Sequence, residues 1–265
     1  MPKNSLNDGP LPQRGVRIRA VPAVTRAVAI LRLLGRSQRP MGVNAIAQTL
    51  DMVPSTCLHI LRALVHERLV SVDGQTKLYG LDVGLLPLAR SVVQGNNFVS
   101  AVQASLDRIA DTWNVTAIGV DVADAEHMVV LALSKSQQPF RLYVDVGSRF
   151  PSLVSATGRL VAALGGQDWD TLALRFAGVR WQRPVNFETW KQEVLLARER
   201  GYSLDDGVYI NGVTIVAVPV LNHRRQITHT IVTAHMQNRL TKTELASLVN
   251  FMQAEASLVA DRILI

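Results

Sequence analysis

The sequence contains little cysteine and has no long apolar run. Cys57 is the one cysteine among 265 residues, so the chain cannot form an internal disulfide or a metal site made of several cysteines. No apolar segment approaches the roughly 20 residues of a membrane-spanning helix. Residues 1–20 carry charges but lack the apolar stretch of a signal peptide. These absences predict a cytoplasmic protein with no membrane partner.

Catalytic signatures are missing as well. The sequence has no G-x-S-x-G elbow, no H-E-x-x-H, no P-loop and no G-x-G-x-x-G. The six histidines are scattered, and His223, His229 and His235 lie at intervals of six, which is not a metal-ligand spacing. We therefore expect no enzymatic activity, no cofactor and no metal.

Basic charge is concentrated in the N-terminal third of the chain. Residues 1–95 contain 12 Lys and Arg against five Asp and Glu, whereas residues 96–265 contain 16 of each sign. The uneven distribution favours two domains over one. A cationic module joined to a neutral one is what binding to a nucleic-acid backbone requires, because Lys and Arg displace condensed counterions from the duplex.

Residues 1–23 are rich in Pro, Gly and Arg and show no helical or strand period, which predicts a mobile basic arm. Arg14, Arg17 and Arg19 could reach the minor groove or the phosphates of DNA. The alternative is a solvated tail that takes no part in binding.

Residues 24–82 have the layout of a winged helix-turn-helix domain. Apolar residues at helical spacing predict the helices, with Thr25 as the first N-cap and Pro54 in the first turn of the third helix. A turn signal between two short β-prone runs predicts a hairpin. The expected elements are helices at 25–36, 43–50 and 54–68, a turn at 51–53, and strands at 69–72 and 77–80 around 73–76.

The third of these helices has two faces. Leu58, Leu61, Leu64 and Val65 form the apolar face, and polar side chains that suit a major groove lie on or beside the other. We interpret it as a recognition helix; the alternative is an ordinary solvated amphipathic face. Lys77 on the wing could contact a phosphate or simply face solvent. The expected DNA contacts are Arg17, Arg19, Arg26, Asn44, Ser55, Thr56, His59, Arg62 and Lys77.

The rest of the chain is expected to form a linker helix at 83–96 and a domain at 97–265. Amphipathic helices alternate with apolar strand-like runs, which predicts an α+β domain with a mixed or antiparallel sheet covered by helices. The expected helices lie at 97–113, 158–164, 169–176, 187–200 and from 245 onward, and the expected strands at 115–122, 128–133, 140–144, 213–220 and 226–234.

Four blocks, in this order, resemble the IclR family of bacterial transcriptional regulators. They are the run from RAVAILRLLGR to GLLPLAR, then VGSRFPSLVSATGRLVAAL, RERGYSLDDGV and GVTIVAVPVLN. The resemblance covers roughly Val24 to the C-terminus, and the ordered succession is more specific than a helix-turn-helix alone. It implies a C-terminal GAF-like domain that binds a small organic acid or aromatic effector, and a homo-oligomer, dimer or tetramer, paired partly through the linker helix.

The resemblance also implies an effector site. In relatives the segment that matches Ser155, Ala156, Thr157 and Gly158 lines the effector pocket. Backbone N–H groups at a helix start, together with the Thr157 hydroxyl, would form a cradle for a carboxylate. The alternative is a plain N-cap in which Ser155 or Thr157 satisfies the first helical turn.

Three further elements could complete that pocket. Thr233 and His235 alternate along one expected strand and Ile215 lies on a neighbouring strand, so we expect them to line it together. Ile215, which stands where the family usually has Cys or Ser, would add an apolar wall. Arg149 could neutralise a ligand carboxylate. The alternatives are a hydrogen-bonded core histidine for His235 and simple exposure for Arg149.

Asp205 and Asp206 form a pair of adjacent carboxylates. Such a pair can serve acid–base chemistry, but no nucleophile or metal ligand accompanies it here, so we expect a solvated turn.

Taken together, these features predict a ligand-controlled transcription factor. Effector binding would alter the separation of two DNA-binding heads across a dimer, and thereby the fit to an operator. Two alternatives stay open: an enzyme of unknown reaction with an appended DNA-binding domain, and an architectural DNA binder that responds to no ligand.

Overall fold

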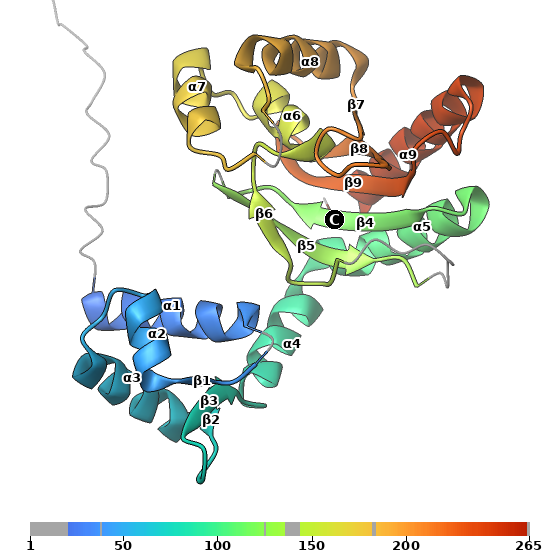
Figure 1. Ribbon diagram of the computed structural model, residues 1–265. Helices are drawn as coiled ribbons and strands as arrows, with labels where there is room; N and C mark the ends of the chain where they lie inside the picture. The colour runs from blue at the N-terminus through green and yellow to red at the C-terminus, as the bar shows by residue number, and fades with distance from the viewer. Residues whose placement is uncertain (1–20, 38, 125, 136–143, 182–183, 264–265) are drawn as a thin grey trace, which may run out of the picture. The chain divides into compact units, whose positions relative to one another are not determined.

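The chain folds as two compact units, which divide between Ser91 and Val92 within helix α4 (Leu85–Gly95; Figure 1). We call them the N-terminal unit and the C-terminal unit. The computed structural model describes residues 21–37, 39–124, 126–135, 144–181 and 184–263. The expected arm, with Arg14, Arg17 and Arg19, lies outside the described residues up to residue 20, and so does most of the strand expected at 140–144.

The N-terminal unit is a winged helix-turn-helix, as expected. A three-stranded antiparallel sheet of order β1-β3-β2 packs beside three helices, over a core built from α1, α2 and α3 with Val70 and Tyr79 of the sheet. Its elements are α1 (Pro22–Arg36), β1 (Met41–Gly42), α2 (Val43–Thr49), α3 (Pro54–His66), β2 (Val70–Val72) and β3 (Leu78–Leu81).

The first helix begins earlier than the sequence pattern predicts. The expectation that Thr25 is its N-cap is wrong: Val21 is the N-cap, and the Thr25 hydroxyl donates to the Val21 carbonyl at 3.4 Å. Pro22 stands at the first helical position, where its fixed φ suits the helix and its missing N–H costs nothing. The proline therefore moves the start by one turn.

The wing hairpin is held by its own turn. Both Gln75 and Thr76 donate their backbone N–H groups to Asp73 Oδ1, at 3.0 and 2.6 Å, and the Thr76 hydroxyl adds a third bond. These donors lower the pKa of the Asp73 carboxyl. Strand β1, which pairs Met41 with Tyr79, was not expected, because two residues carry no periodic signal.

The C-terminal unit is an α+β domain with a six-stranded antiparallel sheet of order β6-β5-β4-β9-β8-β7 among the described residues. Its helix α5 has the expected bounds, and β7 was not expected as a strand. The elements are α5 (Asn97–Trp113), β4 (Thr116–Asp121), β5 (His127–Leu133), β6 (Arg149–Pro151), α6 (Ser155–Leu164), α7 (Trp169–Ala177), α8 (Phe187–Arg200), β7 (Ser203–Asp206), β8 (Val213–Leu221), β9 (Ile227–Met236) and α9 (Lys242–Ile263).

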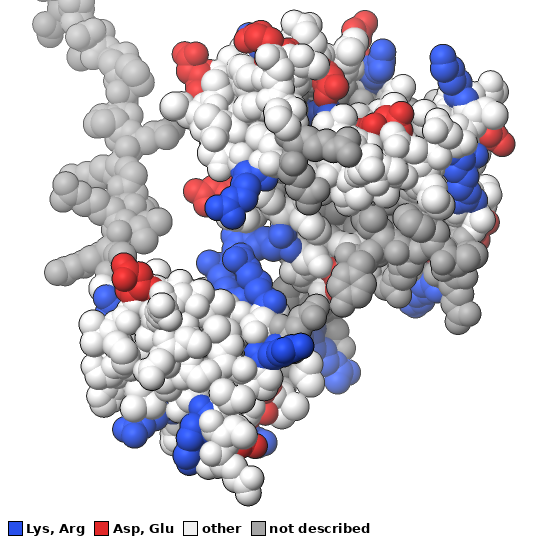
Figure 2. All heavy atoms as spheres, in the orientation of Figure 1, with Lys and Arg blue, Asp and Glu red and all other residues white. Residues whose placement is uncertain are grey.

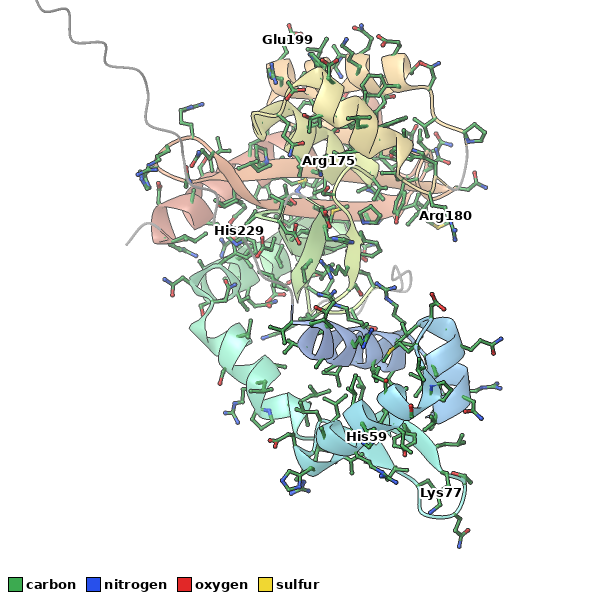
Figure 3. All side chains as sticks on the ribbon, turned by 90° about the vertical axis from the view of Figure 1, so that its left-hand side faces the viewer. His59, Lys77, Arg175, Arg180, Glu199 and His229 are labelled. Carbon is green, nitrogen blue, oxygen red and sulfur yellow. The ribbon has the colours of Figure 1, made fainter. Side chains whose placement is uncertain are left out.

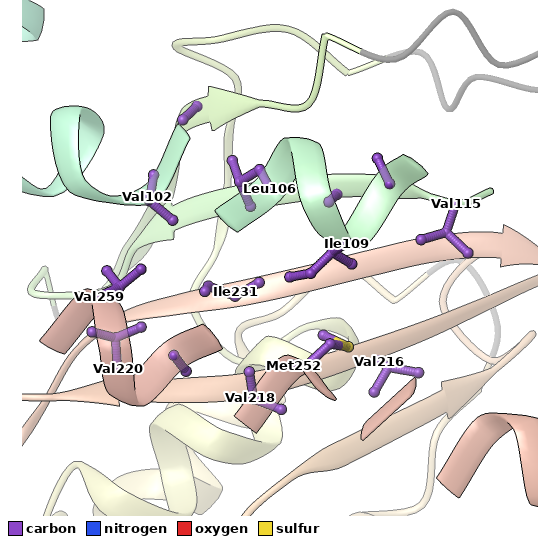
Figure 4. Close-up of a cluster of buried hydrophobic side chains, with 14 of the residues drawn as sticks. Val102, Leu106, Ile109, Val115, Val216, Val218, Val220, Ile231, Met252 and Val259 are labelled. Carbon is purple, nitrogen blue, oxygen red and sulfur yellow. The ribbon is translucent and has the colours of Figure 1, made fainter. Parts of the chain in front are cut away.

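Helices cover both faces of this sheet (Figure 1). On one face Val216, Val218 and Ile231 pack against Leu106 of α5 and Met252 of α9 (Figure 4). An ion pair between Arg108 Nη2 and Glu255 Oε2, at 2.5 Å, joins these two helices. The other face, toward α6, carries a second apolar cluster that includes Ile118, Ile215, Val232 and Ala234. Both faces of β8 are buried, which explains why its sequence is a continuous apolar run.

Candidate functional site

Helix α3 presents a polar face to solvent. Ser55, His59 and Arg62 are exposed and Thr56 is half-buried, whereas Cys57, Leu61 and Leu64 on the other side are buried in the core. The helix enters its first turn through Pro54 after Asp51, whose φ of 51° makes the sharp turn from α2. The division into faces therefore agrees with the sequence pattern at Leu61 and Leu64. The placement of Leu58 on the buried face is wrong, because it is half-buried and lines the hollow between α2, α3 and the wing together with Arg62.

A hollow of about 610 Å³ opens between α2, α3 and the wing, and we call it the wing hollow. It brings Asn44 of α2, Arg62 of α3 and Lys77 of the hairpin into one surface, although the sequence separates them by up to 33 positions. Figure 3 shows Lys77 at the tip of the hairpin, and Figure 2 shows basic side chains over this lower edge of the unit. The complete lining is Gly42, Val43, Asn44, Ala45, Leu58, Arg62, Val72, Thr76, Lys77 and Tyr79.

The wing hollow is cationic. Arg62 and Lys77 are its charged lining residues, and no acidic side chain lines it in the described part of the chain. Asn44 adds an amide that can both donate and accept a hydrogen bond. Arg26 is exposed on α1 but does not line the hollow, and Arg17 and Arg19 lie outside the described residues.

The second candidate site is a cavity of about 330 Å³ between the sheet of the C-terminal unit and the start of α6, and we call it the apolar cavity. Three of the expected residues, Ser155, Thr157 and Ile215, line it together. The remaining lining residues are Ile118, Val120, Met128, Val130, Val144, Phe150, Tyr209, Ile210, Val232 and Ala234.

Polar side chains are few in the lining of the apolar cavity. Its polar side chains are the hydroxyls of Ser155, Thr157 and Tyr209, and no charged side chain lines it among the described residues. Burial, and then the nearby charge of Asp205, raise the pKa of the Tyr209 phenol. Tyr209 is therefore a neutral hydrogen-bond donor at physiological pH.

The start of α6 carries unpaired backbone donors. The N-cap residue Val154 makes no side-chain cap, and the first amide that bonds back into the helix is that of Gly158, to the Val154 carbonyl at 3.0 Å. In the described structure the amides of Ser155, Ala156 and Thr157 donate to no protein acceptor. Neither Ser155 nor Thr157 acts as the plain N-cap that was the alternative. Such N-termini attract anions.

Ser155 has an unusual backbone conformation, with φ of 62° in the left-handed region. Only a small fraction of non-glycine residues adopt it, and the strain costs on the order of 1–3 kcal/mol. Ala156 and Gly158 do not line the cavity, and a Cβ on Gly158 would come within 2.1 Å of the Leu153 carbonyl carbon. These two small residues therefore let α6 approach the preceding segment closely.

The expectation that Thr233 and His235 share a pocket with Ile215 is wrong. Ile215 pairs in register with Ala234, so Ala234 and Val232 face the cavity while Thr233 and His235 point to the opposite face. The Thr233 hydroxyl contacts Met252 Sδ of α9 at 3.5 Å. The strand pattern could not reveal this, because the relative register of two strands is set by their pairing.

His235 is a core histidine, but not a hydrogen-bonded one. It is buried beside Thr214, and its Nδ1 has no hydrogen-bond partner within the described ranges. Burial, and then the positive charge of Arg239, lower its pKa despite the opposing effect of Asp206.

Arg149 also lies apart from the cavity. It forms an ion pair with Asp124, with Nη2 and Oδ2 3.4 Å apart, while the adjacent Phe150 lines the cavity. The pKa of the Asp124 carboxyl is lowered first by the Glu126 N–H and also by Arg149. A carboxylate in the cavity would therefore meet hydroxyls and amides rather than a guanidinium.

A buried ion pair beside the cavity was not expected from the sequence. Arg159 Nη1 contacts Asp205 Oδ2 at 3.0 Å, and both side chains are almost fully buried. Arg159 Nε also contacts Glu193 Oε2 of α8 at 2.5 Å. The expectation of a solvated turn at Asp205 is therefore wrong, because β7 places it between β8 and α6.

Asp205 also holds one wall of the cavity. Its Oδ1 accepts the backbone N–H groups of Val208 and Tyr209, at 3.1 and 3.0 Å. Arg159 lies one turn after the cradle residues of α6, so a single buried carboxylate links the cradle helix to the segment that carries Tyr209 and Ile210. The acidic pair in the sequence was the only available signal, and it did not reveal burial.

Within the described residues, His, Cys, Asp and Glu side chains form no group of three or more that could hold a metal ion, and no helix combines the length and apolar character that a membrane span requires.

A winged helix-turn-helix joined to a helix-covered sheet with an internal cavity defines a two-domain DNA-binding regulator. The family description "Bacterial transcriptional regulator IclR C-terminal" matches residues 90–260, and "IclR helix-turn-helix domain" matches residues 23–74. The chain belongs to the IclR family of transcriptional regulators, whose members are not enzymes.

Similar proteins extend over most of the chain. The probable transcriptional regulator SauR of Cupriavidus necator is 26% identical over 234 residues, which cover 86% of this chain and 91% of that protein. The HTH-type transcriptional regulator KdgR of Escherichia coli is 24% identical over 208 residues, 77% of this chain and 78% of that one.

Solved structures agree in fold. An IclR transcriptional regulator from Alicyclobacillus acidocaldarius aligns with a TM-score of 0.81 and 26% identity, over 92% of this chain and 99% of that one. An IclR homologue from Microbacterium hydrocarbonoxydans, complexed with 4-hydroxybenzoate, aligns with a TM-score of 0.73 and 14% identity, over 91% and 98% of the two chains.

Proposed function

We propose that this chain binds an operator as a dimer or a dimer of dimers and that a small effector in the apolar cavity modulates its affinity for DNA. The observation that carries the proposal is that one chain combines a cationic helix-turn-helix surface with an apolar cavity bordered by an uncapped helix start. Membership in the IclR family of regulators supports the DNA-binding part of the proposal. The apolar cavity supports the effector-binding part.

The DNA contacts follow from the geometry of α3 and the wing. Ser55, Thr56, His59 and Arg62 would enter the major groove, since they share the exposed side of one helix. Asn44 and Lys77, on either side of the wing hollow, would contact the phosphates that flank it. We assign Arg26, Arg17 and Arg19 to further backbone contacts or the minor groove.

The effector would have an apolar body and one small polar head. An aromatic monocarboxylate satisfies both, because its ring would pack on Ile215 and Phe150 while its carboxylate accepts from Thr157, Ser155 and the free amides of α6. The relative from Microbacterium that was solved with 4-hydroxybenzoate holds a compound of this class. A second charged group would be disfavoured, since no described lining side chain is charged and burying an unpaired charge costs several kcal/mol.

Exposed apolar side chains support a homo-oligomer. Val24 on α1 is 61% exposed, and Leu86, Leu88 and Val92 on α4 are 59–66% exposed. Apolar surfaces of this kind commonly mark protein interfaces. A two-fold pair would present two recognition helices to successive major grooves, roughly 34 Å apart.

Regulation then follows from linkage. If the effector binds the conformations of the dimer with unequal affinity, it shifts the population and with it the spacing of the two DNA-binding units. A spacing that no longer matches the half-sites weakens binding, whereas one that matches strengthens it.

DNA binding is tested with a variant in which Ser55, Thr56, His59 and Arg62 are all replaced by alanine. Electrophoretic mobility shifts on the intergenic region upstream of the gene should show sequence-selective binding by the wild type and its loss in the variant. Replacement of Arg224 and Arg225, exposed in the turn after β8, is the matched control and should leave binding intact. Selective binding by the quadruple variant would contradict the proposal.

Effector control is tested separately with a library of carboxylates. A compound that binds the folded chain raises its Tm, by mass action, and should also alter operator affinity. If no compound shifts either quantity while DNA binding persists, the chain is an architectural DNA binder that responds to no ligand.

A further inference from the structure

A second hollow lies in the C-terminal unit, at the start of β5, the segment after β6 and the end of α7. It has a volume of about 470 Å³ and shares no lining residue with the apolar cavity. We call it the arginine hollow, because Arg175 and Arg180, both labelled in Figure 3, lie in its wall. Its lining residues are Glu126, His127, Pro151, Ser152, Leu153, Arg175, Gly178, Val179 and Arg180.

Positive charge exceeds negative charge in this hollow. Among the described lining residues the one acid beside Arg175 and Arg180 is Glu126, whose side chain is 81% exposed and whose charge is therefore screened by solvent. The nearby Asp124 is paired with Arg149 and accepts the Glu126 N–H at 2.8 Å. The two acids thus leave the hollow with a net cationic wall.

Arg175 is held in place and partly desolvated. Its Nη2 donates to Ser152 Oγ at 2.6 Å, and its Nη1 contacts Gln167 Oε1. Burial lowers the pKa of Arg175 in spite of the acids Glu126 and Asp124. The fold has therefore already removed part of the water from this cation before any anion binds. A guanidinium in such surroundings interacts more strongly with an anion than one in bulk water.

His127 adds a polar atom that the described protein does not satisfy. Its Nδ1 is buried and has no hydrogen-bond partner in the described part of the structure, and the nearest acidic oxygen, Glu126 Oε2, is 4.0 Å away. Because Nδ1 is closed to solvent, a ligand in the hollow would meet the accessible part of the imidazole, whose side chain is 33% exposed and lines the hollow.

The C-terminal end of α7 does not oppose an anion strongly. Gly178 N donates to the Leu174 and Arg175 carbonyls, and Val179 N donates to the Phe176 carbonyl at 3.1 Å. These bonds occupy the carbonyl oxygens that would otherwise give the helix end its negative character.

We propose that the arginine hollow is a second ligand site, one that binds a small oxyanion, either a carboxylate or a phosphate. Arg180 and Arg175 supply the charge, and His127 supplies a hydrogen bond. The site is distinct in chemistry from the apolar cavity, whose described lining has three hydroxyls and no cation. It does not depend on the effector proposed above.

Isothermal titration of the full chain with inorganic phosphate, and separately with acetate, at constant ionic strength tests the proposal. Saturable binding of either anion is expected, and the anion that binds identifies the class. Arg180→Glu should weaken it at least about tenfold, since a charge-assisted hydrogen bond is lost and a like charge is introduced. Arg224→Glu makes the same charge change in an exposed turn and should leave binding unchanged.

A second variant separates the site from general electrostatics. His127→Leu leaves Arg175 and Arg180 in place, and it should weaken the same binding without a loss of secondary structure. The proposal is wrong if neither anion binds saturably, or if Arg180→Glu and Arg224→Glu weaken binding to the same extent.

Discussion

At the scale of single residues, the polar side chains described in the lining of the apolar cavity are a few hydroxyl groups. Thr157 is a useful probe because valine has nearly the same shape, so Thr157→Val removes the hydroxyl and little else. Thr233, only one residue away from cavity-lining Ala234, points to the opposite face and contacts Met252. The two threonines thus form a matched pair.

We expect Thr157→Val to weaken the binding of an aromatic acid about tenfold, the worth of one hydrogen bond of about 1.4 kcal/mol. Thr233→Val should leave that affinity unchanged. Titration calorimetry with the best compound from the carboxylate library measures both, and equal losses in the two variants would show that Thr157 has no special role.

Gly158 tests the packing behind the cradle. A Cβ there would come within 2.1 Å of the Leu153 carbonyl carbon, so Gly158→Ala should lower the free energy of unfolding by about 1–3 kcal/mol or more. At Gly178 an added Cβ meets its nearest atom, the Arg175 carbonyl oxygen, at 3.5 Å, an ordinary contact. Urea unfolding of the Gly158→Ala and Gly178→Ala variants compares their stabilities. Similar unfolding midpoints for the two variants would be inconsistent with close packing at Gly158.

At the scale of elements, ion pairs hold helices of the C-terminal unit in place, and two of them can be compared. Arg159 and Asp205 join α6 to β7 next to the apolar cavity, whereas Arg108 and Glu255 join α5 to α9 on the other face. Only the first pair is connected to a cavity wall, through the bonds from Asp205 to Val208 and Tyr209.

Asp205→Asn should therefore lower both stability and effector affinity. Breaking a buried pair on one side costs about 3–5 kcal/mol. Glu255→Gln should lower stability by less, because Arg108 is 44% exposed, and it should leave effector affinity unchanged. Equal affinities in the two variants would refute the link between Asp205 and the cavity wall.

Strand β9 carries two histidines that burial keeps neutral. The His229 ring stacks on Phe98 with centroids 4.0 Å apart, and burial lowers its pKa below the ordinary value of 6.5, as it does for His235. The unfolded chain therefore binds these protons more readily. Stability is fully present above pH about 6.5 and is lost as the pH falls toward the lowered values.

We expect the Tm of the C-terminal unit to fall between pH about 6.5 and 5 and His229→Phe to make that fall shallower. His223→Phe, at an exposed position in the turn after β8, is the control. Scanning calorimetry across this range measures the effect; a fall that is equally steep in His229→Phe and wild type would assign it to other groups.

At the scale of the whole molecule, charge and apolar surface are divided between the units. The basic excess belongs to the N-terminal third, so operator affinity should fall steeply with salt. Lys77→Ala should reduce the slope of log K against log salt by about one, as expected for one lost phosphate contact. Lys242→Ala, at the start of α9, should not change it. Fluorescence anisotropy at several salt concentrations measures the slopes.

The sequence predicted the order of elements and most of the faces of α3 well, because amphipathic spacing within one helix is a local property. Leu58 is the exception, since α2 and the wing form the hollow that it lines. Residues 97–113 and 187–200 were predicted with the bounds that α5 and α8 have. The prediction failed where the answer depended on segments far apart in the chain. Thr233 was placed in the pocket and Asp205 in solvent, yet the register of β8 with β9 and the position of α6 reverse both.

By itself, then, the amino-acid order determined a basic winged helix-turn-helix module joined to a second domain, because helical periods, turn residues and basic charge can be recognised within short segments. The resemblance of four ordered blocks to the IclR family added the type of regulator. Only the tertiary structure decided which side chains meet in the apolar cavity, that no cation lines it among the described residues, and that Arg159 pairs with Asp205. The physical reason is that strand register and ion pairing are set by packing between distant segments, and each depends on partners that no local window contains.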